Sequence, residues 1–357
     1  MNQRDKILAR FAGAGSGAPL YLPDLTAWYE WHRGRGTLPE PWQEWSLPEI
    51  ARDLGLPIWL TVQPWRLETT ELKVTLEEAG AERTLRADTP HGTLQARWQQ
   101  GPDGDWWQVE YPVKDAGDLP AALALAEARA YALDGAGLAR ARELVGEDGI
   151  LALELPRRAL SDLLHEFLGW GEGLLLLDDT LVQQMLIILE GKLQLLVQEI
   201  CQLDGRMVLS PDNLDGQFVS PRLFDRHLAD SYRLTTRMLH RYDKVLVVQA
   251  GGPVAHLLAP LATAGVDGVQ GIAGPPQGNT TLAEARALAG PGMTLWGGIP
   301  QDYLLDVHGE EALEAAVRQA AAEAAGDGRM ILGVADRVPP AADLERVTAI
   351  ATMLGKA

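Results

Sequence analysis

The C-terminal two-thirds of the chain alternates between short apolar runs and longer segments in which apolar residues recur every three or four positions. The short runs have the length of strands that are buried on both faces, and the longer segments have the period of amphipathic helices. The runs are Ile150–Glu154, Met207–Ser210, Val245–Gln249, Gly268–Ile272, Thr294–Gly297 and Met330–Gly333. Repeated strand–helix units of this kind predict a parallel sheet that is covered by helices.

The helical segments fill the spaces between these runs. They are Thr180–Leu203, Pro221–Tyr242, Val254–Ala264, Leu282–Ala289, Glu310–Ala325 and Ala341–Leu354. Ser220 before Pro221 is a helix start signal, and Gly290 is a stop signal. Near the N-terminus, Pro19–Pro23 predicts one more strand, followed by a helix from Leu25.

Residues 57–112 interrupt the alternation. They contain four short strand-like segments that turn residues separate: Leu72–Leu76, Glu82–Ala87, Thr93–Trp98 and Trp106–Val109. This pattern predicts an antiparallel meander inserted into the larger fold. A helix near Leu119–Leu133 then resumes the alternation. We therefore expect an α/β protein, a (β/α)8 TIM barrel that forms a single domain over residues 1–357, with a β-rich insertion at 57–112.

Composition limits the partners and the compartment. The chain is 46% hydrophobic and has a formal net charge of -18, which disfavours nonspecific binding to nucleic acid or to an anionic membrane. Its single cysteine, Cys201, excludes an intrachain disulfide and a site with several thiolates. Uninterrupted apolar runs such as Met185–Leu189 are too short to span a bilayer. We expect a cytoplasmic protein without a signal peptide.

The reactive groups of an α/β barrel project from the carboxyl ends of its strands. Polar and aromatic side chains at or after the predicted strand ends are therefore candidates for a small-molecule site. They are Asp24, Trp28, His32, Asp212, Asn213, Gln249, Gln270, Asn279, Trp296, Asp336 and Arg337.

Asp212 and Asp336 are the candidate catalytic groups of this set, because a carboxyl at a barrel mouth can donate a proton or orient a substrate. Asp212 could equally cap a turn, and Asp336 could form a structural ion pair with Arg337. Trp28 and Trp31 would share a helix face that could cover a planar ligand, although a core position or a dimer surface explains them as well. Gly297 and Gly298 fit either an anion cradle or close backbone packing.

Read in order, several segments resemble the uroporphyrinogen decarboxylase superfamily. The strongest match runs from Gly265–Asp267 through Pro275–Arg286 and ends in Leu295–Ile299. The other matching segments are Arg4–Leu8, Pro19–Tyr29, Ser210–Asn213, and Ile331–Gly333 through Pro339–Pro340. The resemblance implies a TIM barrel, and the superfamily includes both the decarboxylase and methyltransferases that pass methyl groups to or from corrinoids or thiols.

The branches of this superfamily differ at positions that can be compared with this chain. The decarboxylase has an arginine-rich motif that binds substrate carboxylates, whereas Leu22–Tyr29 contains no arginine. The thiol-alkylating methyltransferases hold zinc through His-X-Cys and a later Cys, and the matching positions here are Gln249, Gly251 and Val334. Since none of these is a good zinc ligand, we expect no metal at this site. The chain most resembles the branch of corrinoid-linked demethylases.

The resemblance thus implies a methyltransferase that moves a methyl group from a small methylated donor, for example a methoxy-aromatic compound, to a corrinoid carried by a partner protein. The carboxyl candidates would protonate or hold the leaving atom, and the amide side chains would orient the donor. Two alternatives remain: a metal-independent decarboxylase or lyase of a small acid, and a non-catalytic barrel subunit. Because relatives with this barrel are often dimeric, we also expect a homodimer.

Overall fold

The computed structural model describes residues 1–15, 19–101 and 104–355. Its contacts divide the chain into two compact units. The first comprises residues 1–64, 135–155 and 201–357, and the second comprises residues 65–134 and 156–200.

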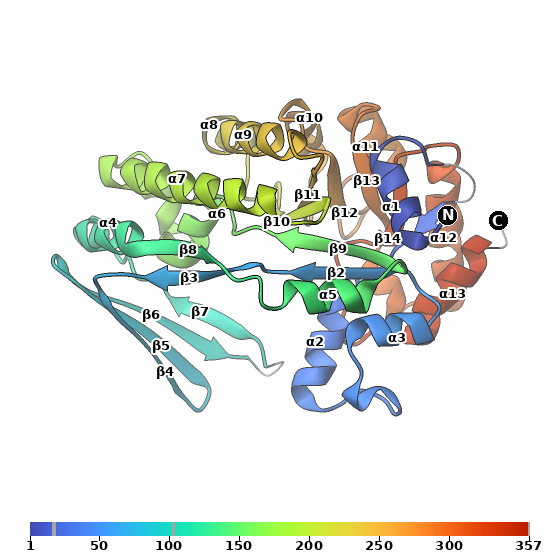
Figure 1. The fold of residues 1–357 in the computed structure, drawn as a ribbon, viewed down its shortest axis with the longest axis horizontal. Helices are drawn as coiled ribbons and strands as arrows, with labels where there is room; N and C mark the ends of the chain where they lie inside the picture. The colour runs from blue at the N-terminus through green and yellow to red at the C-terminus, as the bar shows by residue number, and fades with distance from the viewer. Residues whose placement is uncertain (16–18, 102–103, 356–357) are drawn as a thin grey trace. The chain divides into compact units, whose positions relative to one another are not determined.

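The first unit is built on an eight-stranded sheet whose neighbouring strands are parallel (Figure 1). The strands follow the order β1-β14-β13-β12-β11-β10-β9-β2. They span Leu20–Tyr21 (β1), Ile58–Val62 (β2), Gly149–Glu154 (β9), Met207–Leu214 (β10), Val245–Ala250 (β11), Gly268–Ile272 (β12), Thr294–Ile299 (β13) and Met330–Val334 (β14). This sheet, with helices after its strands, confirms the predicted α/β barrel class.

A tryptophan of β13 contacts residues near both ends of the strand order in the interior of the barrel. Trp59 of β2 packs edge-on against Trp296 of β13, with ring centroids 4.8 Å apart. Trp296 Nε1 also donates a 3.0 Å hydrogen bond to the carbonyl oxygen of Leu22, just after β1. Ile7 and Phe11 of the first helix join the same buried cluster. The interior is therefore a packed apolar core, as in other barrels of this kind.

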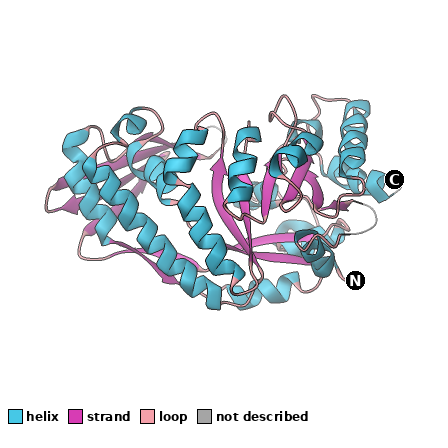
Figure 2. Cartoon of the chain, turned by 90° about the horizontal axis from the view of Figure 1, so that it is seen from above, coloured by secondary structure: helices cyan, strands magenta, loops and turns pink. Residues whose placement is uncertain are grey.

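Helices flank the strands of this sheet (Figure 2). Some of them begin at side-chain caps: the Ser220 side chain accepts from the backbone N–H of Leu223, and Thr281 and Glu284 form a capping box. The helices of this unit are α1 Gln3–Phe11, α2 Thr26–Arg35, α3 Leu47–Asp53, α5 Leu138–Val145, α8 Pro221–His227, α9 Ala229–His240, α10 Ala255–Thr263, α11 Leu282–Ala289, α12 Glu310–Ala324 and α13 Leu344–Gly355.

The second unit contains the predicted antiparallel meander, β4-β5-β6-β7. Its strands span Lys73–Ala79, Glu82–Thr89, Gly92–Gln100 and Trp106–Glu110, and a separate antiparallel pair joins β3 Trp65–Thr69 to β8 Arg129–Leu133. Helix α4, Leu119–Ala128, packs on β5 and β6. Ala87, Leu94 and Ala96 are buried on those two strands, so one face of the meander forms a small core while the other stays polar.

Three predicted boundaries differ from the structure. Residues 58–62, placed in the insertion by their sequence, form barrel strand β2, which pairs with β9. The segment predicted as one helix to Leu133 ends at Ala128 and continues as strand β8. The predicted helix Pro221–Tyr242 is divided into α8 and α9 at Leu228.

Helix α7, Thr180–Gln202, is long and apolar enough to cross a bilayer by length and composition. The sequence analysis did not identify it, because polar residues interrupt its apolar positions. Its apolar residues recur every three or four positions, and most are buried within the protein: Val182, Met185, Leu189, Leu193, Leu196 and Ile200. This is the pattern of a core helix.

Candidate functional site

Two hydrogen bonds at the carboxyl ends of the strands cross the interior of the barrel. Gln249 Nε2 on β11 donates to Asp336 Oδ1 after β14, and Gln270 Nε2 on β12 donates to Asp24 Oδ2 after β1; both distances are 3.2 Å. In each case two other strands lie between the partners in the sheet order, so the bonds do not join neighbours. We call Asp24, Gln249, Gln270 and Asp336 the mouth cluster.

Side-chain alternation explains why both amides face inward. Val247 belongs to the apolar cluster of the barrel interior, and Gln249, two residues later, points to the same side. Gln249 pairs with Gln270, which in turn pairs with Trp296 of the same interior cluster. The two amides therefore form a polar layer directly above the apolar core.

Asp24 is held firmly in this layer. Its side chain is buried, and its Oδ1 accepts a 2.9 Å hydrogen bond from the N–H of Thr26 at the start of α2. Its backbone carbonyl accepts from the N–H of Val338 at 2.8 Å. The segments after β1 and β14 are thus joined at the mouth.

The Asp336 carboxylate has longer contacts with its hydrogen-bond donor and its ion-pair partner than Asp24 has with the N–H of Thr26. Burial raises the pKa of the Asp336 carboxyl, and the negative charge of Asp24 raises it further. The positive charge of Arg337 and the hydrogen bond from Gln249 act in the opposite direction and lower this pKa. Arg337 Nε lies 3.7 Å from Asp336 Oδ1, but the arginine side chain is 43% exposed. Asp336 has a positive φ of 67°, a conformation that non-glycine residues adopt rarely and that is often found at functional sites.

The Gln270 amide has an acceptor with no hydrogen-bond partner among the described residues. Gln270 is 1% exposed, and its Oε1 is buried without a donor. A flip of the amide would place this oxygen against the Asp24 carboxylate, so the bond to Asp24 fixes which atom is Nε2. A buried unpaired acceptor costs about 1–3 kcal/mol, which a ligand that donates a hydrogen bond would recover.

Asp212, the other candidate catalytic carboxylate, is bonded to residues outside the mouth cluster. Leu209 faces the barrel interior, so the next residue, Ser210, faces the helices. The strand is irregular between Ser210 and Leu214, and a contact with α9 places Asp212 on the helix side. Asp212 Oδ2 accepts hydrogen bonds from Ser210 Oγ at 2.7 Å and from Tyr232 Oη of α9 at 2.6 Å. The structure therefore separates Asp212 from the mouth cluster, and its contacts join α9 to β10.

The neighbouring Asn213 and the more distant Asn279 are both exposed. Asn213 has a positive φ of 46° in the irregular end of β10. Asn279 Oδ1 accepts a 3.1 Å hydrogen bond from the N–H of Ala255, the first residue of α10. These contacts are those of a turn and a helix start.

The predicted aromatic and imidazole groups also have structural contacts. Trp296 is in the barrel core, and Trp28 is buried against His32, with centroids 4.6 Å apart. The two ring nitrogens of His32 contact Thr37 Oγ1 at 2.8 Å and the carbonyl oxygen of Pro340 at 3.0 Å. Of the predicted site residues, the structure thus brings together Asp24, Gln249, Gln270 and Asp336, with Arg337 at the rim.

Glu30 is a rim residue that the sequence reasoning missed. It is exposed on α2, and the charges of Arg337 and Asp24 act on its carboxylate. Its place about one turn into α2, the helix that starts just after Asp24, was the available signal. An acidic residue on a helix is, however, usually only a solvated one.

The surroundings of Gly297 distinguish the two interpretations of this glycine, an anion cradle or close backbone packing. A Cβ at this position would lie 2.2 Å from the carbonyl oxygen of Ile272, and its φ is 147°. Close packing of β13 on β12 therefore requires glycine there.

The three positions that match the zinc ligands of the thiol-alkylating methyltransferases hold residues that are not zinc ligands. Gln249 is bonded to Asp336, and Val334 is buried in β14. Among residues 1–15, 19–101 and 104–355, no group of three or more His, Cys, Asp or Glu side chains is arranged to hold a metal ion. The expectation of no zinc remains a prediction for metal analysis.

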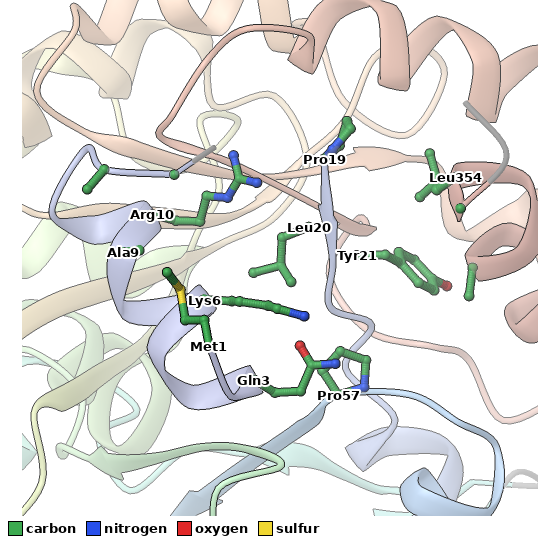
Figure 3. A pocket seen from close by; sticks show the side chains of 14 residues that line it. Met1, Gln3, Lys6, Ala9, Arg10, Pro19, Leu20, Tyr21, Pro57 and Leu354 are labelled. Atoms are coloured by element: carbon green, nitrogen blue, oxygen red, sulfur yellow. The ribbon is translucent and has the colours of Figure 1, made fainter. Parts of the chain in front are cut away.

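A cavity of about 430 Å³ lies at the other end of the barrel (Figure 3). Lys6 and Arg10 of α1 line it, together with Pro19 and Pro57, which precede β1 and β2. It is thus at the amino ends of the strands, away from the mouth cluster. Residues at that end of a barrel usually serve stability.

The comparisons with known proteins support the fold. The chain shares its fold with a methyltransferase from Methanosarcina mazei, at 15% sequence identity and a TM-score of 0.61, over 100% of this chain and 99% of that one. A D-psicose 3-epimerase matches 62% of the chain and 83% of its own length at 13% identity, with a TM-score of only 0.35. No family model and no curated protein matches the sequence. The predicted resemblance to methyltransferase barrels is confirmed at the level of the fold.

Proposed function

We propose that this protein is a methyltransferase whose barrel mouth binds a small methylated donor and whose methyl acceptor is a corrinoid held by a partner protein. The observation that carries the proposal is the mouth cluster, in which two carboxyls and two amides from four strands converge. The fold shared with a methyltransferase over the whole chain supports the same reaction class. The proposed enzyme acts in the cytoplasm as a homodimer.

Asp336 is the residue that would act on the leaving atom of the donor. Its raised pKa lets it keep a proton at a higher pH than an ordinary aspartate, so it can protonate a leaving oxygen, or it can hold a leaving nitrogen as a carboxylate. Gln249 fixes the position of Asp336, and Asp24 fixes Gln270. These fixed contacts orient the donor before reaction.

The mouth cluster does not fit a corrinoid as a resident cofactor. It contains no imidazole or thiolate, and the imidazole predicted for the site, that of His32, has contacts at both ring nitrogens. We therefore assign the corrinoid to a partner, whose reduced cobalt would supply the nucleophile for the methyl group. The residues of this chain bind and orient the donor.

The proposal is tested by incubating the protein with reduced free cobalamin and a panel of methylated donors. We expect a donor-dependent change in cobalamin absorbance that requires the protein. The control is Asp230→Asn, because Asp230 is 92% exposed on its side chain and lies on α9, where it pairs with Arg233. This variant should react like the wild type.

Two other results would replace the proposal. Release of carbon dioxide from a small acid, without methyl transfer, would indicate the decarboxylase alternative. Tight ligand binding with no turnover of any donor would indicate a non-catalytic barrel subunit.

A further inference from the structure

We propose that the mouth cluster selects a donor whose methyl group is attached to a protonated nitrogen, that is, a small N-methylammonium compound with at least one N–H. This inference rests on the proposed methyl transfer for its biological meaning. The binding preference itself can be measured without any acceptor.

The charges at the mouth favour a cation. Asp24 and Asp336 are both carboxyl groups, and the only other groups of the cluster are neutral amides. Arg337 compensates one carboxylate from the rim, at 3.7 Å and partly exposed, while Glu30 adds a further negative charge. An anionic ligand would be repelled, and a neutral ether would leave the buried Asp24 without a cationic partner.

The hydrogen-bonding groups specify an N–H donor. Each amide Nε2 donates one hydrogen bond to a carboxylate, and the carboxylates and amide oxygens of the cluster are acceptors that a ligand N–H can use. Gln270 Oε1 is buried and lacks a donor, and the fixed orientation of its amide turns this oxygen away from Asp24. A quaternary ammonium has no N–H to offer this acceptor. A protonated secondary or tertiary amine provides both the charge and the donor.

The leaving group is also consistent with this choice. When the bond between the methyl carbon and a protonated nitrogen breaks, the electron pair of that bond stays on nitrogen, and the amine departs neutral. The methyl group passes to the nucleophilic acceptor, and no further proton is required. Asp336 can then remain ionised and hold the cation.

Binding to the protein alone tests the inference. Isothermal titration would compare N-methylbenzylamine, which is protonated at pH 7, with two close analogues: benzyl methyl ether, which is neutral, and benzyltrimethylammonium, which has no N–H. Related sets with smaller and larger substituents extend the same comparison. We expect the N-methylammonium member to bind at least about 10-fold more tightly than either analogue, a difference of about 1.4 kcal/mol.

Variants locate the preference in the mouth cluster. Asp336→Asn is nearly isosteric and should reduce the preference for ammonium over ether about 10-fold, whereas Asp230→Asn should leave it unchanged. Gln270→Leu should abolish the preference for the N–H compound over the quaternary one. Gln270→Met, which also removes the amide oxygen, serves as a second variant if the leucine protein does not fold, and it should abolish the same preference.

The outcomes separate this inference from the proposed function. Equal binding of ether and ammonium, or no binding of any ammonium compound at millimolar concentration, overturns the inference even if methoxy donors are demethylated. Selective ammonium binding without methyl transfer to cobalamin supports the inference and contradicts the proposed function.

Discussion

Two regions of the barrel each place an aspartate near the carboxyl end of a parallel strand, and the two aspartates differ in their contacts. On the outer side of β10, Asp212 accepts from two hydroxyl donors, Ser210 and Tyr232, within 2.7 Å. At the mouth, Asp336 has one amide donor at 3.2 Å and an arginine at 3.7 Å. The first carboxylate is satisfied by the fold, whereas the second has capacity for a ligand.

The difference arises from the alternation of side chains along a strand. A shift of one residue turns a side chain from the barrel interior to the helix layer, and Asp212 falls on the helix side while Gln249 falls on the inner side. A carboxylate near a strand end is thus a mouth residue only if its alternation points inward. Variants of both regions can test this distinction.

The largest expected effect is on turnover in Asp336→Asn. Loss of the carboxyl that holds or protonates the leaving atom should lower the rate of methyl transfer about 100-fold, the scale usual for such a group. The initial rate, normalised to folded protein, measures this. A rate within threefold of the wild type would remove Asp336 from the mechanism.

Asp212→Asn should show the opposite pattern. Two buried hydroxyls donate to one carboxylate oxygen, and an amide cannot fully replace it, so we expect a loss of about 1–3 kcal/mol in the free energy of unfolding. Activity per folded molecule should survive. Denaturant unfolding and the cobalamin assay on the same preparation decide between this interpretation and the catalytic one, which predicts a large loss of turnover with little change in stability.

A smaller effect is expected for Tyr232→Phe, which removes one of the two donors to Asp212. Its cost should be about 1 kcal/mol. The double variant with Asp212→Asn should lose less than the sum of the single variants, because both changes remove the same hydrogen bond. Additive losses would mean that the two side chains stabilise the fold independently.

The fold could largely be predicted from the sequence because barrel strands that are buried on both faces form continuous apolar runs. All six runs from Ile150 onward lie within observed strands, and the largest extension is that of Met207–Ser210, whose strand continues to Leu214. β2 was missed because Ile58–Val62 is followed by β3 and then by the meander strands. The short strand-like segments and turn residues of that region led the sequence analysis to place Ile58–Val62 in the insertion. β8 was missed because Arg129–Leu133 continues an alanine-rich helical pattern, and its pairing with β3 decides its conformation.

The site was only partly predictable. The rule that barrel chemistry lies after the strands correctly selected Asp24, Gln249, Gln270 and Asp336 as neighbours in space. The same rule could not tell them from Asp212, Asn279 or Trp296, because sequence position does not show which side chains have partners. Tyr232, twenty residues beyond Asp212 and on a helix, is such a partner.

The smallest effect expected is the pH dependence of stability at the mouth. Burial raises the pKa of the folded Asp336 carboxyl above its ordinary value of 3.8, so the folded state holds this proton more tightly than the unfolded state does. The stability that this proton contributes is complete below the ordinary pKa and is lost as the pH rises through the folded pKa. Asp336→Asn has no such titration and keeps an oxygen that can accept from Gln249. Its Tm should therefore exceed that of the wild type at pH 7, and the difference should shrink toward pH 4. Asp230→Asn should show no such trend. A difference that grows as the pH falls would mean that ionised Asp336 is stabilised by the fold, and the mouth would then resemble the outer side of β10.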